Sequence, residues 1–259
     1  MLTAFVRAFQ TPDLRKKLLI TLGLIALFRL GASLPTPGIS EKNVAFCSNA
    51  ATQGSTAGVL AIVNLLSGQA LLRLSVFALG IMPYITASII LQLLTVVIPR
   101  LETLKQEGQA GQAKITQYTR YLTVGLAVLQ STGYVELARS GTLFNGCGAA
   151  GNHPLIPNDS VFAIATMVIT MVAGTTVIMW MGELITDRGV GNGMSVLIFT
   201  TVISVIPGEV LAIYRVKWAF YAAIAIVVVI AIVAFIVFME QAQRRIPVQY
   251  AKRMVGRRM

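Results

Sequence analysis

The chain has 259 residues, of which 56% are hydrophobic and only 12% are charged. A soluble domain carries about a quarter charged residues, so this composition excludes an ordinary soluble protein. A mean hydropathy of +0.75 indicates an integral membrane protein instead. The formal net charge of +11 would suggest a nucleic-acid ligand in a soluble protein, but in a membrane protein its distribution along the chain carries more information.

Long apolar runs predict membrane-spanning helices, because helices satisfy their backbone groups within the segment. We expect a first helix at 18–34, which the sequence PTPG ends, and later helices at 121–137, 161–185, 193–213 and 218–239. Pro207 predicts a kink. The first ten residues lack the apolar region and cleavage site of a signal peptide, so we expect the first helix to be retained. With one crossing from residues 59–99, the sequence predicts six spans.

The stretch 59–99 is nearly all apolar, with Arg73 as its only charge. One crossing needs about 20 residues, so the stretch is too long for one span and too short for two spans with a polar turn. Its first part, 59–72, contains polar residues such as Asn64 and Gln69. We expect a short helix that folds back from the outer side, with an amphipathic helix on the outer surface as the alternative.

Lys and Arg are concentrated in the loops at one side of the predicted bundle. The positive-inside rule therefore predicts that both termini are cytoplasmic. Counting 59–99 as two full crossings would remove this asymmetry. The charge pattern thus favours one crossing preceded by a segment that does not cross.

Few charged residues fall within the predicted spans. Arg29 lies in the first helix and could either reach the interface or face other helices. Glu183 and Asp187 are four residues apart, on one helix face, and indicate either a cation site or a solvated helix end. An ion-coupled carrier would need several such groups near the midplane. A passive pore therefore fits better than a carrier, and a purely structural subunit is a further alternative.

The connection between residues 185 and 193 is glycine-rich. We expect Gly189 to end one helix in a left-handed conformation and Asn192 to cap the next. The two helices should then be antiparallel neighbours. Cys47 and Cys147 fall in predicted outer loops, where they could form a disulfide or remain two free thiols.

Two pairs of apolar residues are spaced four apart: Ile81 with Ile85, and Met194 with Ile198. Each pair forms one stripe on a helix, which indicates ordinary packing or a hydrophobic constriction that gates by dewetting. The only histidine is His153, and no predicted span carries a pair of carboxylates. Neither an enzyme nor a cofactor is expected. The basic residues after 240 suggest an RNA, an acidic protein or anionic lipid as partner.

Five segments carry a resemblance to the bacterial SecY family: FRLGASLPTPGI, FALGIMPYITASIILQLLTVVIP, EGQAGQAKITQYTRYLT, MWMGELITDRGVGNGMS and RRIPVQYAKR. The resemblance implies an all-α membrane protein, the central subunit of the protein-conducting channel of the bacterial inner membrane. Family members have ten spans in two halves of five around an hourglass pore that also opens sideways into lipid. Residues 1–215 would form the first half, and 216–259 would form span 6 and the start of the cytoplasmic 6/7 loop. Spans 7–10 would then be missing from this chain.

The resemblance also implies roles for particular residues. Residues 58–72 would be a plug helix, and 75–98 would be span 2. The implied site residues are Leu60, Asn64, Leu65 and Gly68 in the plug; Ile81, Ile85, Met194 and Ile198 in the pore ring, where isoleucine is usual at position 194; Thr86 and Gln92 in the lateral gate; and Arg244, Arg245, Lys252 and Arg253 as a docking site. The implied partners are SecE, SecG, the SecA motor or a translating ribosome with its RNA, signal sequences, nascent chains and the bilayer.

Overall fold

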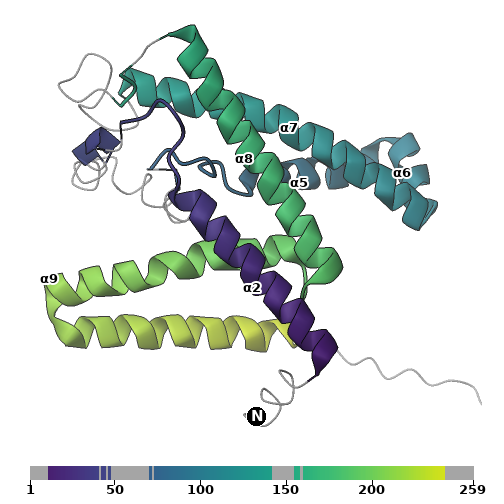
Figure 1. Cartoon of the computed structure of the whole chain (residues 1–259). Coiled ribbons are helices and arrows are strands. Elements are labelled where there is room, and N and C mark those ends of the chain that lie inside the picture. The colour runs from purple at the N-terminus through teal and green to yellow at the C-terminus, as the bar shows by residue number, and fades with distance from the viewer. Residues whose placement is uncertain are drawn as a thin grey trace, which may run out of the picture. The chain divides into compact units, whose positions relative to one another are not determined.

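The computed structural model describes residues 11–40, 42–44, 46–47, 70–71, 73–141, 155–157 and 160–242. Among these residues, the α-helices with defined bounds are α2 (Pro12–Ser33), α5 (Met82–Val97), α6 (Pro99–Gln106), α7 (Gln109–Ser140), α8 (Val161–Arg188) and α9 (Gly193–Glu240) (Figure 1). Pro35 and Ser75 form an isolated β-bridge. The chain divides into two compact units at Ile206 and Pro207. The packing described below lies within the first unit.

By length and hydropathy, two helices in the described ranges can cross a membrane alone, Val161–Arg188 and Ala223–Glu240. A third candidate is α5 together with α6, which are bent by 100° at the break between them. Pro99 causes this break, because it lacks an N–H and holds the preceding residue, Ile98, in an extended conformation. The count of six crossings stays a prediction.

Several predicted helix boundaries were wrong. Helix α2 begins at Pro12 rather than at 18, because proline is well suited to the first helical position, where no donor is needed. Residues 99–120, expected to be a loop, form α6 and the first turns of α7. The helices expected at 193–213 and 218–239 both lie within α9, which contains Pro207 and the separate apolar segments Gly193–Gly208 and Ala223–Glu240. The predicted kink at Pro207 stays a prediction, although the two units divide there.

The second half of the long apolar stretch also differs from the prediction. Helix α5 begins at Met82, not at 75. The preceding residues form successive turns, in which Leu74 and Gly80 take positive φ values of 46° and 57°. The turns are buried among apolar side chains, and Ser75 is fully buried. Irregular backbone of this kind is tolerated at membrane depth only where protein surrounds it.

These turns pair with the segment that follows α2. Pro35 and Ser75 form an antiparallel bridge. The Thr36 N–H donates to the Leu74 carbonyl at 3.1 Å, and the Val76 N–H donates to the Leu34 carbonyl at 2.9 Å. The Thr36 hydroxyl adds a bond of 2.7 Å to the same Leu74 carbonyl. The two ends of the intervening stretch are therefore held together. The predicted plug helix at 58–72, with Leu60, Asn64, Leu65 and Gly68, lies outside the described residues apart from positions 70 and 71.

Helix α7 packs against α5, α6 and α8. Its buried face is made mostly of small residues at nearly regular spacings of four: Thr119, Thr123, Ala127, Ser131, Val135 and Ala138. The Thr123 hydroxyl donates to the Thr119 carbonyl, so the polar atom is satisfied within the helix. Small residues let helix backbones approach closely in a membrane, where burying apolar surface supplies no driving force.

Helix α2 packs against α8 and against the turns before α5. The rings of Phe28 and Phe77 are stacked, with centroids 5.9 Å apart. Gly31 lies against the Phe77 ring, where a side chain at position 31 would collide with it. Arg29, on the same helix, has an exposed side chain. Cys47 is fully buried and disulfide-bonded, while Cys147, the other cysteine of the chain, lies outside the described residues.

Candidate functional site

An apolar cluster lies where α2, α8, the start of α9 and the turns before α5 meet. We call it the inner cluster, and its buried members are Leu24, Phe28, Ala32, Ala70, Phe77, Ile81, Ile178, Met181, Ile185 and Leu197. Ile85 and Met194 are partly buried and pack against it. Three of the four residues expected in the pore ring, Ile81, Ile85 and Met194, are thus brought to one cluster from segments more than a hundred positions apart in sequence.

The fourth residue, Ile198, does not join the inner cluster. Its side chain is 36% exposed. Ile81 precedes the first turn of α5, and its carbonyl accepts the Ile85 N–H at 3.2 Å. The two isoleucines therefore still lie one helical turn apart on neighbouring surface.

Met194 reaches this position through the short connection between α8 and α9. The Asn192 side chain caps α9, as predicted: its Oδ1 accepts the Met194 N–H at 3.0 Å and the Ser195 N–H at 3.4 Å. The prediction for Gly189 was wrong, because its φ is −101° and it is not left-handed. Gly191 takes the left-handed conformation instead, with φ of 76°. Helix α8 still ends at Arg188, directly before Gly189, so only the left-handed residue lies two positions later than expected.

Two glycines allow the start of α9 to lie directly on α8. A Cβ at Gly193 would collide with the carbonyl group of Gly182, and a Cβ at Gly182 would meet the Met194 side chain. The Thr186 hydroxyl accepts the Gly193 N–H at 2.9 Å and so fixes the approach. The position of Met194 is therefore set by the position of α8.

A cavity of ≈ 520 Å³ opens beside Ile85 and Met194. Helices α5, α7 and α8 and the start of α9 line it. Its walls are mixed, with apolar side chains next to polar and charged ones; the lining residues are Tyr84, Ile85, Ser88, Ile89, Gln92, Thr116, Arg120, Glu183, Thr186, Asp187, Asn192 and Met194. The structure therefore places two expected ring residues at the wall of a partly polar cavity.

Part of the cavity wall is formed by an ion pair between Arg120 on α7 and Glu183 on α8. Arg120 Nε donates to Glu183 Oε1 at 2.9 Å, and Arg120 Nη2 donates to Glu183 Oε2 at 2.7 Å. Arg120 Nη1 also donates to Gln117 Oε1 at 3.2 Å. The side chains are 42% and 20% exposed, respectively. The interpretation of Glu183 as part of a solvated helix end was therefore wrong, whereas Asp187 is exposed.

This pair was not predicted, although the sequence contains a signal for it. Arg120 directly precedes an expected span, and Glu183 lies near the end of the next expected span. Consecutive spans are antiparallel, so these two positions fall at similar depth on the same side of the bundle. Opposite charges at such positions are candidates for an interhelical pair.

The two expected gate residues lie on α5. The Thr86 hydroxyl donates to the Met82 carbonyl at 3.0 Å, and Gln92 lies within 3.5 Å of the Ser88 hydroxyl. Gln92 lines both the cavity described above and a neighbouring cavity of ≈ 330 Å³ between α5 and α7. The expected docking residues Arg244, Arg245, Lys252 and Arg253 lie outside the described residues.

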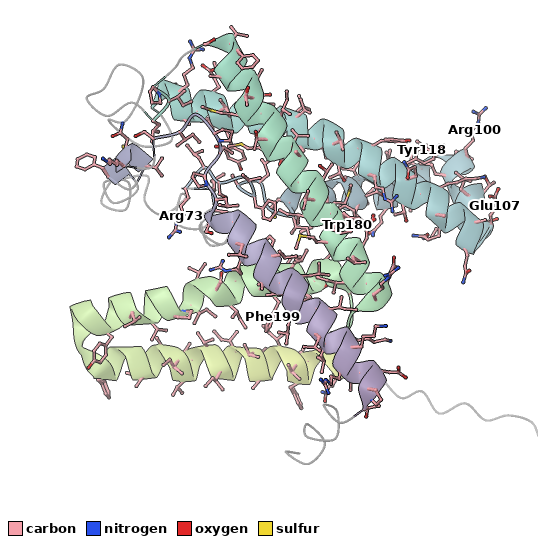
Figure 2. The ribbon with its side chains drawn as sticks, in the orientation of Figure 1. Arg73, Arg100, Glu107, Tyr118, Trp180 and Phe199 are labelled. Carbon is pink, nitrogen blue, oxygen red and sulfur yellow. The ribbon has the colours of Figure 1, made fainter. Side chains whose placement is uncertain are left out.

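The charged residues that flank α5 lie far apart. Figure 2 shows Arg73 beside the C-terminal end of α2, and Arg100 and Glu107 on the other side with α6 and the start of α7. A polar end on each side, with an apolar helix between them, is the arrangement of a membrane-spanning element. Together with the apolar helices α8 and Ala223–Glu240, this defines the class of the molecule as a multi-pass helical membrane protein.

Comparison with known proteins gives the family. The SecY family model matches residues 75–259. The chain is 60% identical to the protein translocase subunit SecY of Streptomyces coelicolor, over all of this chain and 59% of that relative. It is 52% identical to the subunit of the same name from Mycobacterium tuberculosis, over 100% of this chain and 58% of the relative. The chain belongs to the SecY family, and it spans about 59% of the length of these curated relatives.

The fold agrees with this membership. A Sec61 chain in the canine ribosome-channel complex from the endoplasmic reticulum superposes with a TM-score of 0.53 over 90% of this chain and 49% of that chain. The sequence identity is only 15%, so this likeness concerns the fold alone. It confirms the prediction of a SecY-type helical membrane bundle.

Proposed function

We propose that this chain forms the N-terminal part of the pore subunit of a protein-conducting channel. Residues 1–215 would be the first half of the channel, and residues 216–259 would be span 6 with the start of the cytoplasmic 6/7 loop. The observation that carries the proposal is the gathering of Ile81, Ile85 and Met194 at one apolar cluster beside a cavity. Membership of the SecY family supports it, since the curated relatives are named protein translocase subunits.

The proposed mechanism is passive. An unfolded chain passes through an apolar constriction of branched and flexible side chains, which closes around it and limits the leak of ions. Met194 is unbranched and more flexible than isoleucine, so the ring can deform more easily at that position. The driving energy comes from a docked motor or ribosome, and this chain itself performs no catalysis.

The plug and the lateral gate complete the proposal. Residues 58–72 block the outer funnel at rest, and the paired segments around Pro35 and Ser75 support this role because they hold the ends of the intervening stretch together. Thr86 and Gln92 lie on α5 at the side through which hydrophobic signal sequences leave. The partly polar cavity at Gln92 supports this position for the gate.

The proposed partners are the small subunits SecE and SecG, secretory and membrane-protein nascent chains, and either the SecA motor or a translating ribosome. Arg244, Arg245, Lys252 and Arg253 bind the motor or the ribosomal RNA, because a cluster of basic residues attracts acidic surfaces and phosphate. The protein lies in the bacterial inner membrane with a cytoplasmic N-terminus. The excess of Lys and Arg in the loops on that side supports this orientation.

Ion leak through the complete channel tests the proposal. Ile85→Ser introduces a polar group at the wall of the cavity beside the inner cluster, so it should hydrate the constriction and raise the resting conductance of reconstituted channels. Ile90→Ser is the matched control, because Ile90 lies on α5 but belongs neither to the inner cluster nor to the cavity wall. Equal conductance in the two variants would contradict a ring at Ile85.

A further inference from the structure

The ion pair between Arg120 and Glu183 joins α7 to α8 at the wall of the cavity. The buried face of α7 consists mostly of Thr, Ser and Ala, which allow close approach of the helices, while larger apolar side chains of both helices, such as Val135 and Met171, lie in a separate buried cluster. The Arg120 guanidinium holds both carboxylate oxygens of Glu183, at 2.9 and 2.7 Å. A bidentate contact fixes orientation as well as distance.

Each partner is connected to one side of the constriction. Glu183 follows Gly182, the residue on which Met194 and Gly193 rest, so a shift of α8 at this level moves Met194. Arg120 lies on α7, which packs against α5, the helix that carries Ile85. The ion pair and the packing of α7 on α5 thus connect the helix that carries Ile85 with the part of α8 that lies against Met194. All of these residues except Gly182 and Gly193 also line the same cavity.

We propose that the Arg120–Glu183 ion pair is a positioning element that sets the spacing between Ile85 and Met194, and therefore the width of the constriction at rest. The inference rests on the proposed function for its effect on ion leak, but not for its effect on the spacing itself. Neither charge needs to touch the transported chain. The pair acts through the two helices that it joins.

The experiment uses the complete channel and measures spacing and leak separately. Spacing is measured between nitroxide labels attached at Ile85→Cys and Met194→Cys. Arg120→Gln and Glu183→Gln each remove one charge and should shift the label distances to longer and broader distributions. Without the labels, the same variants should raise resting ion leak roughly tenfold, which corresponds to about 1.4 kcal/mol in the resting equilibrium.

Two further variants separate positioning from other roles. The exchange Arg120→Glu with Glu183→Arg keeps an ion pair but reverses its direction, so it should return both the label distances and the leak toward the unsubstituted values. Lys114→Gln is the matched control, because it removes an exposed ion pair with Glu107 near the start of the same helix. It should change neither measurement.

The outcomes distinguish this inference from the proposed function. Unchanged label distances in both single variants would overturn the positioning role, whatever happens to the leak. Altered distances that the charge exchange does not restore would also overturn it, and would indicate a role that depends on the sign of each charge. Altered and restored distances without any change in leak would support the positioning role and contradict the proposed pore.

Discussion

The contact between Gly193 and Gly182 allows a sharp prediction about stability. At Gly193, a Cβ would overlap the carbonyl of Gly182, which is backbone and cannot rotate away. At Gly182, a Cβ would meet the Sδ and Cε atoms of Met194, at the end of a flexible side chain. The same chemical change should therefore have different effects at two residues in contact.

The magnitudes follow from two opposing terms. Overpacking typically costs about 1–3 kcal/mol, and replacing a helical glycine by alanine recovers about 0.5–1 kcal/mol. Gly182→Ala should therefore lie within about 1 kcal/mol of the unsubstituted protein, because Met194 can move aside. Gly193→Ala should destabilise by about 2–3 kcal/mol, since it stands at the first position of α9, gains little propensity, and must push the backbones apart.

The assay is thermal unfolding of the detergent-solubilised chain, followed by circular dichroism. Gly125→Ala is the control, because Gly125 lies within α7 and its added Cβ would meet no atom within 4 Å. Gly125→Ala should leave the midpoint unchanged or raise it, Gly182→Ala should change it little, and Gly193→Ala should lower it clearly. If Gly193→Ala unfolded at the same temperature as Gly182→Ala, the close backbone approach of α8 and α9 would be refuted.

The remaining predictions use the same assay. Asn192→Ala removes the side-chain oxygen that accepts hydrogen bonds from the N–H groups of Met194 and Ser195, so it should lower the free energy of unfolding by about 1 kcal/mol. Asn192→Ser should retain most of the stability, because serine can also cap a helix. Equal losses in both variants would contradict a capping role. Phe28→Ala leaves a cavity against Phe77 and should destabilise by about 3 kcal/mol. Leu27→Ala, at an exposed neighbouring position, should cost far less, and a comparable loss there would contradict the packing of α2.

The sequence predicted the start of α8 well and the interrupted segments poorly. The start of α8 was correct at Val161, because a polar loop borders an uninterrupted apolar run. The start of α5 was wrong by several residues. Apolar composition cannot distinguish buried turns from helix, and here Leu74 and Gly80 break the helix by their positive φ values without any change in hydropathy.

The candidate site was predicted in part. Spacing alone indicated that Ile81 and Ile85 share a face, but only the family resemblance linked them with Met194. Their common cluster depends on contacts across the fold, which local periodicity does not contain. The pair of Arg120 with Glu183 was not predicted, because the charge pattern places Arg120 among the loop residues and Glu183 near a helix end, and no local pattern connects the two.

The bridge between Pro35 and Ser75 links the end of α2 mechanically to the turns that precede α5. The segment that follows α2 and the turns before α5 are joined by backbone hydrogen bonds, from Thr36 to Leu74 and from Val76 to Leu34. A force on the residues between Thr36 and Leu74 is therefore resisted by these hydrogen bonds before it reaches α2 or α5. If that stretch were displaced, the junction between α2 and the turns before α5 would remain in place.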